Sequence, residues 1–539
     1  MKNTARKLLV FLLIATMSIF SFSGCKAKDS DTTKTDETDT TETDTTGTEE
    51  KVTSFTYFMH GKFVNWLNDL SWYTYVDEAT GVTPELVSGP EDDAGFYAEV
   101  DQRLISKTYP DAGIAKLSQA QIYGSQGAFL DLKPLIDKYA PDIKAYIEAN
   151  PDYAKLITTE DGAIYGLPTE NPVFADLIGY RADHLEKAGI TTLPTTLDEF
   201  TEMLRQLKTF YGATNENYYP LSGRDSFIKW AAYFDCTANF NDGVAKGISF
   251  NANSTGNGVQ SGTDVLAEGY KAMVEWYKVL YNEGLIDPEW VAGASTEESW
   301  EAKVLTGQTS VFYDFFTRPQ WFTDNGGADQ DPDFKLAVLD YPKNYKGEVT
   351  KVSTPQKWAE GRSTVINASS EDKAETILSY LNFFFTEEGQ TLANWGVEGE
   401  SFKVGASGNE YIVNYSEQET TPVGEDRWSF LNDRLTFVKP VDNTAFYAWN
   451  GDVVKGAAAR CFVPENLASL ANVAYNTEQM TELASIASTI QDTVVAETIK
   501  FVTGDRDMGE WDSFIADIKE QGYSRVVEVE QAAYDTMYK

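Results

Sequence analysis

The sequence predicts an α/β fold of two lobes joined by a hinge, with a helical C-terminal tail, and three observations support this. The body of the chain, residues 51–539, is too long for one hydrophobic core, because single cores stop growing at roughly 250–300 residues. Apolar segments of strand length alternate with amphipathic helices, which is typical of βαβ units with mainly parallel strands. Segments near 169–176 and 356–361 interrupt this alternation, and we interpret them as crossovers between the lobes.

The individual elements follow from the spacing of apolar residues. Short apolar runs bounded by polar or turn residues predict strands at 52–59, 110–115, 309–315, 334–341 and 363–367. Apolar residues at helical spacing predict helices around 96–105, 200–207, 265–280 and 371–385, and along most of the chain from 477 on. Thr196 and Glu199 form a capping box before the second of these helices. Ser369 or Ser370 is expected to cap the helix at 371–385.

The first 25 residues have the features of a lipoprotein signal peptide. Three basic residues precede an apolar run at 8–22, which is shorter than the roughly 20 residues that span a bilayer. Ser23-Gly24-Cys25 then resembles a lipobox, so we expect lipid on Cys25 and a protein anchored at the extracellular face of the cell membrane. The alternative is ordinary secretion with a chance cysteine at this position.

Residues 26–50 predict a disordered tether. The segment is rich in threonine and acidic residues and has no apolar cluster to bury, so it cannot offset its ordering entropy. We expect residues 51–172 plus about 360–445 to form the first lobe, and about 173–359 plus 446–539 to form the second.

The charge balance limits the kind of partner. The formal net charge is −39, with 83 acidic against 44 basic residues, and phosphate binding needs clustered lysine and arginine. We therefore expect no nucleic-acid partner. An anionic ligand would need local arginines to overcome this field, whereas a neutral ligand meets no such obstacle.

The segment 371–402 carries a family resemblance. Its second half reads YLNFFFTEEGQTLANWGVEGESF and resembles the late helix-turn segment of the family-1 extracellular solute-binding proteins, in their large lipoprotein branch. Segments 179–189, 193–200, 282–289 and 501–511 are also similar to that family, in the same order along the chain. The resemblance implies a periplasmic-binding-protein-like fold that captures a solute, often a sugar, for the permease subunits of an ABC importer. It also implies a binding protein and not an enzyme, and we expect a monomer.

Few residues are suited to metal or nucleophilic chemistry. The chain has two histidines, His60 and His184, and neither an HExxH nor a paired CxxC motif. We expect His184 at the surface, no metal and no cofactor. The place where many relatives carry a calcium loop, 211–223, keeps Asn215, Glu216 and Asn217 but lacks the alternating aspartates. A secreted glycoside hydrolase stays the less favoured alternative, because a pair of suitable carboxylates is always present among so many acids.

Three cysteines are few for an exported protein. With Cys25 lipidated, Cys236 and Cys461 remain, and they could form a disulfide or be two buried thiols. We favour free thiols, because a protein with more than one core needs no disulfide to fold.

The candidate ligand residues are aromatic rings beside planar polar groups. Phe, Trp and Tyr make up 13% of the chain, and sugars offer flat C–H faces to rings and hydroxyls to Asp, Glu and Arg. We expect a neutral oligosaccharide, with peptides or another polar solute as the alternative. The predicted ligand residues are Trp66, Tyr123, Arg224, Trp230, Asp314, Phe315, Phe316, Arg318, Trp358, Trp395 and Glu398.

Three of these rings, Trp230, Phe315 and Trp395, are predicted to stack on the sugar. For each ring the competing interpretation is a core residue, because Trp and Tyr are highly buried on average.

Overall fold

The computed structural model describes residues 52–68, 70, 73–224, 227–235, 250–252, 259–261, 268–325, 327–405, 411–413, 436–469 and 476–538. The predicted signal peptide, the lipidated Cys25, the tether and Cys236 lie outside these ranges. Cys461 is a buried free thiol.

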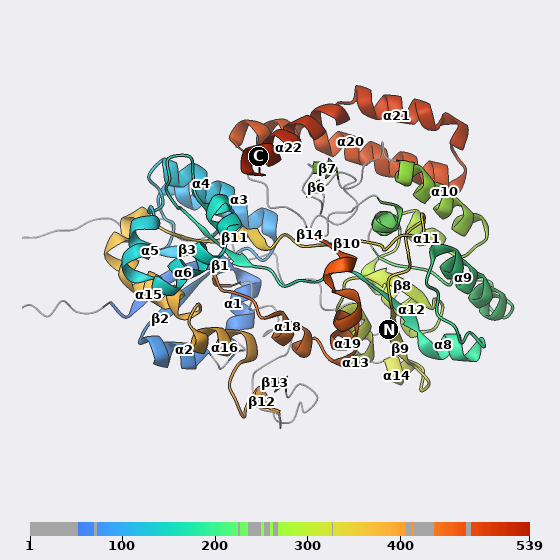
Figure 1. Cartoon of the computed structure of the whole chain (residues 1–539), viewed down its shortest axis with the longest axis horizontal. Coiled ribbons are helices and arrows are strands. Elements are labelled where there is room, and N and C mark those ends of the chain that lie inside the picture. Colours follow the sequence, from blue (N-terminus) through green and yellow to red (C-terminus); the bar gives the residue numbers. More distant parts are fainter. Residues whose placement is uncertain are drawn as a thin grey trace, which may run out of the picture. The chain divides into compact units, whose positions relative to one another are not determined.

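The first sheet has five strands in the order β2 (Thr83–Gly89), β1 (Ser54–His60), β3 (Ala112–Ala115), β11 (Trp358–Ile366) and β4 (Leu167–Glu170). β1 pairs in parallel with β2 and β3, whereas β11 runs antiparallel to β3 and β4. The carboxyl ends of β1 and β2 therefore lie together at one edge of this sheet. The sheet itself is at the left of Figure 1. The bounds of the helices that accompany it are α1 (Gly61–Asn68), α2 (Tyr73–Thr80), α3 (Asp93–Ser106), α4 (Leu117–Ser125), α5 (Lys133–Tyr139), α6 (Pro141–Ala149), α7 (Pro151–Ile157), α15 (Ala374–Phe383) and α16 (Glu387–Trp395).

The second sheet has three strands in the order β8 (Val311–Asp314), β5 (Leu177–Arg181) and β9 (Leu336–Leu339). β5 is antiparallel to both neighbours, so the prediction of mainly parallel strands is wrong for this sheet. The reason is that β5 enters the lobe from the crossover, and both neighbours run back toward it. The helices around it are α8 (Ala182–Lys187), α9 (Leu197–Gly212), the 3-10 helix η1 (Phe227–Phe234), α10 (Glu268–Asn282), α11 (Pro288–Val291), α12 (Glu297–Leu305), α13 (Arg318–Asp324) and α14 (Gly327–Gln330).

The helix ends follow ordinary capping chemistry. Thr196 caps α9 as predicted, since its side chain accepts a hydrogen bond from the Glu199 amide. The cap before α15 was predicted wrongly. Asn367, and neither serine, is the cap: its side chain accepts a hydrogen bond from the Ser369 amide in the short 3-10 turn η3 (Ala368–Lys373) that precedes this helix.

Three stretches of chain connect the two sheets. The first is 171–176 between β4 and β5, and the second is the return to β11. The third begins near 445–446, where a lobe boundary is predicted, and runs through α18 (Asn443–Trp449), α19 (Asp452–Cys461) and the 3-10 turn η4 (Pro464–Asn466) to β14 (Leu467–Ser469), which pairs with β10 (Val352–Thr354).

The connections are hydrogen-bonded side by side. The Asn171 amide donates to the Lys357 carbonyl at 2.8 Å, and the Glu170 amide donates to the Lys439 carbonyl at 3.3 Å.

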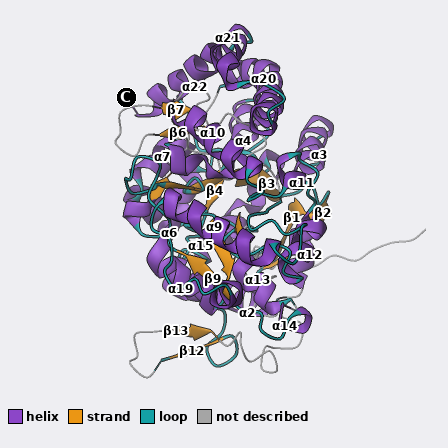
Figure 2. Ribbon diagram, turned by 90° about the vertical axis from the view of Figure 1, so that its right-hand side faces the viewer, coloured by secondary structure: helices purple, strands orange, loops and turns teal. Residues whose placement is uncertain are grey.

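Buried apolar side chains form two large clusters, one for each sheet. The first includes Phe446 and Cys461 of the third connection, and the second includes Phe501 and Phe514 of the C-terminal helices. The predicted helical tail is confirmed as α20 (Thr477–Thr503), the 3-10 turn η5 (Met508–Glu510), α21 (Trp511–Glu520) and α22 (Tyr523–Tyr538). Figures 1 and 2 show these helices together beside α10, which α20 contacts. Two short hairpins complete the described elements, β6 (Phe250–Ala252) with β7 (Val259–Ser261) and β12 (Phe402–Val404) with β13 (Tyr411–Val413).

Candidate functional site

The carboxyl ends of β1 and β2 place four charged or polar side chains together. In open α/β sheets, ligands bind outside the carboxyl ends of the strands. β1 ends at His60 and α1 begins with Gly61-Lys62, while the turn after β2 leads to Asp93 at the start of α3. Arg362 joins them from β11, at an irregularity in its pairing with β4 between Ala359 and Ser363. We call His60, Lys62, Asp93 and Arg362 the first polar cluster.

Asp93 is the centre of this cluster. Its Oδ1 atom lies 3.0 Å from Nε2 of His60, 3.2 Å from Nη2 of Arg362 and 3.8 Å from Nζ of Lys62. Arg362 also donates through Nη1 to the hydroxyl of Tyr97. The Asp93 carboxylate therefore contacts the side chains of His60, Lys62 and Arg362.

The protonation states in the first polar cluster follow from burial and hydrogen bonding. His60 is 0% exposed, and this burial lowers the pKa of His60 below 6.5, with a smaller lowering from Arg362. The hydrogen bond from His60 holds the pKa of Asp93 well below its usual range, and the charges of Arg362 and Lys62 add to the effect. A neutral imidazole thus donates to an ionised carboxylate.

Trp66 adjoins this cluster through Phe63. The ring centroids of Phe63 and Trp66 are 5.3 Å apart, and the Arg362 guanidinium lies 5.0 Å from the centroid of Phe63. Trp66 is half-buried, so part of its ring is available to a ligand.

A second polar cluster surrounds Asp314 at the carboxyl end of β8. Asp314 has no exposed surface, and it accepts hydrogen bonds from Nε of Arg224 at 2.9 Å and from Nζ of Lys229 at 2.8 Å. Nε of Arg318 lies 3.7 Å from the same carboxylate. The structure therefore brings together three predicted residues, Arg224, Asp314 and Arg318.

Other carboxylates complete the pairing of these cations. Arg224 lies 3.1 Å from Glu297, Arg318 pairs with Glu297 and with Glu301 at 2.7 Å, and Lys229 lies 3.4 Å from Asp176. Burial raises the pKa of Asp176, although the charge of Lys229 opposes that rise.

Phe315 and Phe316 belong to an aromatic cluster at the crossover. Phe174 of the first connection lies 5.4 Å from Phe315 and 4.7 Å from Phe316, and Phe316 lies 5.3 Å from Phe446 of α18. Phe316 is buried, whereas Phe315 is half-buried. Of the two rings, Phe315 therefore has the exposed surface that a ligand could contact.

Trp230 and Trp358 lie in the two hydrophobic cores. Trp230 is 0% exposed and packs against Phe200 and Tyr313. A ring without exposed surface offers no face to a sugar, so we correct this prediction and assign Trp230 to the core. Trp358 is also buried, and its Nε1 donates to the Tyr146 hydroxyl at 3.0 Å.

The remaining predicted residues lie at separate places. Trp395 is 5% exposed and donates through Nε1 to Asp442 at 2.8 Å. Glu398 is exposed in the turn after α16, and Tyr123 is half-buried with its hydroxyl bonded to Asp101 at 3.0 Å. A ligand role for Trp358, Trp395, Tyr123 and Glu398 stays a prediction.

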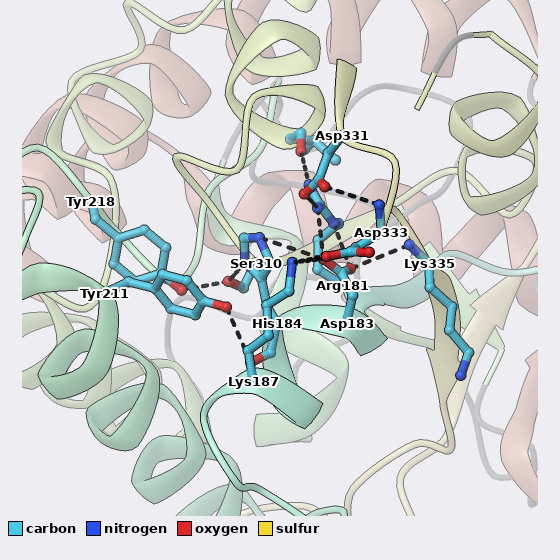
Figure 3. Close-up of polar contacts among 11 residues, drawn as sticks. Arg181, Asp183, His184, Lys187, Tyr211, Tyr218, Ser310, Asp331, Asp333 and Lys335 are labelled. Carbon is cyan, nitrogen blue, oxygen red and sulfur yellow. Dashed lines mark hydrogen bonds and ion pairs between the residues drawn. The ribbon is translucent and has the colours of Figure 1, made fainter. Parts of the chain in front are cut away.

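The expectation of a surface position for His184 is wrong. His184 is 4% exposed, its Nδ1 lies 2.6 Å from Oγ of Ser310, and its ring stacks on Tyr211 at 4.5 Å (Figure 3). It begins a helix too short to show an apolar stripe in the sequence, so periodicity could not indicate its burial.

His184 also belongs to the one group in the described ranges with metal-ligand chemistry, Asp183, His184 and Asp331. The guanidinium of Arg181 lies among these side chains, 2.8 Å from Asp183 and 2.6 Å from Asp331 (Figure 3). Since this cation already pairs with both carboxylates, the arrangement is an ion-pair network that a metal ion would have to disrupt.

A cavity of about 700 Å³ lies elsewhere, between β9 and α19. Tyr180, Tyr341, Asp340 and Arg460 are among its lining residues, and none of the predicted ligand residues is.

The sequence prediction missed Asp93, Arg362, Lys229 and Asp176. β2 is a half-exposed strand without clear alternation, so Asp93 could not be recognised as following a strand end. The position of Arg362 depends on the pairing irregularity in β11, which the sequence does not show. The sequence did point to the neighbourhood of the other two residues. Lys229 precedes the predicted ligand residue Trp230, and Asp176 ends the predicted crossover at 169–176.

Comparison with known proteins agrees with this architecture. The bacterial extracellular solute-binding protein family matches residues 64–391. The fructooligosaccharide ABC transporter substrate-binding protein FusA of Streptococcus pneumoniae serotype 4 is 23% identical over 438 residues, which is 77% of each chain.

Two solved structures share the fold. An extracellular solute-binding protein from Bifidobacterium longum subsp. infantis has a TM-score of 0.67 at 17% identity, covering 91% of this chain and all of that one. The alginate-binding protein AlgQ2 has a TM-score of 0.64 at 20% identity, covering 90% and 98%.

The two-lobe periplasmic-binding-protein-like fold is therefore confirmed. Among the described residues, no helix has the length and apolar character needed to span a membrane. The family is one of solute-binding proteins and not of enzymes. Because the family match covers more than half of the 539 residues, the chain belongs to the bacterial extracellular solute-binding protein family.

Proposed function

We propose that this protein captures a neutral oligosaccharide outside the cell and delivers it to the permease subunits of an ABC transporter. We propose a neutral ligand because the cations of both polar clusters are already paired with carboxylates. Arg224, Lys229 and Arg318 each contact a carboxylate, and so do Lys62 and Arg362. A cation already paired in this way is poorly placed to compensate an anionic ligand.

The relatives support a carbohydrate ligand. FusA is named for fructooligosaccharides and has been solved with kestose, and a Bifidobacterium longum infantis protein with a TM-score of 0.65 is described as binding HMO. AlgQ2 is described as alginate-binding, and alginate is a polyanion. The fold alone therefore does not choose between neutral and acidic sugars, and the charge pairing is the reason for our choice.

Calorimetric titration tests the ligand class. The panel should contain neutral fructo- and milk-type oligosaccharides, an alginate oligosaccharide and short peptides. We expect saturable binding to a neutral oligosaccharide and recovery of that sugar uncleaved. Tight binding confined to the peptides or to the alginate fragment would overturn the proposal, and cleavage of the sugar would revive the hydrolase alternative.

We also propose that lipid on Cys25 anchors a monomer to the outer face of the membrane through the 26–50 tether. Intact-mass analysis of membrane-extracted protein should show a diacylglycerol-modified N-terminal cysteine. A product cleaved elsewhere and free of lipid would contradict the anchor, and light scattering of the soluble domain would test the monomer.

A further inference from the structure

The polar contacts of the Asp93 side chain involve only one of its two carboxylate oxygens within the described residues. His60, Lys62 and Arg362 all approach Oδ1. Within the part of the chain that the structure describes, no residue is recorded against Oδ2, and 57% of the Asp93 side chain is exposed. One oxygen of this carboxylate is thus fixed by the protein while the other faces solvent.

The groups that fix Oδ1 are rigid. The His60 ring is fully buried and stacks on Phe96 with centroids 3.7 Å apart. The Arg362 side chain is 12% exposed, lies over Phe63 and donates to Tyr97. A side chain held in this way loses little further rotamer freedom when a ligand binds, which is the energetic advantage of a preorganised site.

The exposed oxygen also has a suitable location. Asp93 follows the carboxyl end of β2, beside the end of β1, where ligands of α/β sheets bind. Phe63 contacts both Arg362 and Trp66, so a half-buried aromatic ring lies one side chain away from the carboxylate anchor. A ring face and a hydrogen-bond acceptor are the two kinds of group that a sugar unit can use.

We infer that Asp93 binds the ligand directly, its Oδ2 accepting a hydrogen bond from a sugar hydroxyl, and that His60 and Arg362 are positioning residues that hold it there. This inference rests on the proposed oligosaccharide function and assigns a residue to it. It also gives Asp93 a part in specificity. A fixed negative charge strengthens a hydrogen bond from a neutral hydroxyl and repels a uronate or phosphate group at the same place.

The test compares Asp93→Asn with Glu91→Gln. Both variants remove one negative charge, but Glu91 is an exposed neighbour in the turn after β2 and has no role in the cluster. For the neutral oligosaccharide that binds the wild type most tightly, we expect Asp93→Asn to raise Kd by about 10-fold or more, the effect of losing a charged hydrogen bond. Glu91→Gln should change Kd less than about 2-fold.

A second measurement removes any dependence on folding. In the same protein samples, the ratio of Kd for an alginate oligosaccharide to Kd for the neutral sugar should fall in Asp93→Asn and stay constant in Glu91→Gln. Both values come from one folded population, so partial unfolding cancels. If Asp93→Asn does not yield folded protein, Asp93→Glu keeps the charge but displaces the carboxylate by one methylene group, and we expect it to weaken the neutral sugar as well.

The outcomes separate the two proposals. An unchanged Kd and an unchanged ratio in Asp93→Asn, or full affinity in Asp93→Glu where that variant is the one measured, would overturn the role of Asp93 and leave the oligosaccharide function intact. Failure of the wild type to bind any sugar in the panel would instead remove the proposed function, and the assignment of Asp93 with it.

Discussion

At the residue scale, the buried His184 makes the folded protein less stable at acid pH. Burial is the main reason that the pKa of His184 is lowered to about 4, and the charge of Arg181 lowers it further. An unfolded histidine titrates near 6.5. Between these values the unfolded chain holds a proton that the folded protein does not, so the free energy of unfolding falls as pH falls from about 6.5 to 4.

The carboxylates of the same network act in the same direction. Burial alone would raise the pKa of Asp183, but hydrogen bonds and charge from Arg181 outweigh it, and the pKa of Asp183 lies below 3.8. Its stabilising contribution is therefore present above that value and is lost at more acid pH.

His184→Gln should flatten the dependence of stability on pH. Urea unfolding at several pH values between 7 and 4 should show a wild-type loss of up to about 3 kcal/mol from this residue, and the variant should lack most of it. The chain has only one other histidine, His60, and burial lowers its pKa as well. His60→Gln should therefore flatten the dependence in the same sense, and the double variant should lose both contributions. An unchanged slope in His184→Gln would show that the acid sensitivity arises elsewhere.

The burial of Trp395 makes its two interpretations separable. The ring is 5% exposed and hydrogen-bonded to Asp442, so Trp395→Ala should cost about 3–5 kcal/mol of stability, as for a core tryptophan. If the ring serves the core alone, the Kd of folded molecules stays unchanged. The ligand role predicted for Trp395 requires instead a weakened Kd. Glu398→Gln, in the exposed turn nearby, should leave the melting temperature unchanged, and its Kd tests the ligand role predicted for Glu398.

The sequence alone does not distinguish a ligand-binding tryptophan from a core tryptophan. The pattern of an aromatic ring beside a polar group is the same whether the polar group meets a sugar or satisfies the indole nitrogen, as Asp442 does for Trp395. Which of the two occurs depends on how the ring packs in the folded protein. Asp314 and Arg318 lie in one short segment, whereas Arg224 reaches Asp314 from 90 residues away, and the sequence does not show that pairing.

At the element scale, elements with a strong apolar period were predicted and elements without one were not. α15 lies within the helix predicted at 371–385, and α16 follows it and ends at Gly396, whose φ is +82°. β2 was missed because neither face is buried, and the irregularity in β11 was missed because it depends on pairing. Those two features bring Asp93 and Arg362 together, so the first polar cluster could not be predicted.

The junction of α15 and α16 requires a glycine at 389. A Cβ atom there would lie 1.8 Å from the Phe383 carbonyl oxygen, and a backbone atom cannot move aside as a side chain can. Gly389→Ala should therefore destabilise the protein by about 1–3 kcal/mol or more. Gly399→Ala is the comparison, since its φ is +87° but no atom lies within 4 Å, and it should cost about 1 kcal/mol. Equal melting temperatures for the two variants would contradict the clash.

At the scale of the whole molecule, the prediction of two lobes is confirmed, while the boundary between them near 445–446 stays a prediction. Residues 436–469 contribute buried apolar side chains to the first cluster, and their last strand, β14, pairs with β10. The packing of this segment depends on contacts with residues far away in the chain, so the sequence could indicate where it lies but not which core it joins.

Calcium should not contribute to the stability of this protein. Two similar structures are described with reference to calcium or to an EF-hand, but segment 211–223 of this chain lacks aspartates, and Asn215 accepts a hydrogen bond from the Asn217 amide. We expect the same melting temperature in EDTA and in millimolar CaCl2. A saturable rise of several degrees with calcium would contradict this, because a bound ion stabilises the folded state in proportion to its occupancy.

The three connections have a mechanical consequence. Residues 170–171 lie between 356–357 and 439–441 and are hydrogen-bonded to both neighbours. A single segment would allow the lobes to swivel about its axis, whereas three segments hydrogen-bonded side by side should resist twisting and bend most readily across their width. We therefore expect the lobes to open and close mainly along one bending coordinate, so that a ligand held between them meets the same pair of surfaces in every cycle.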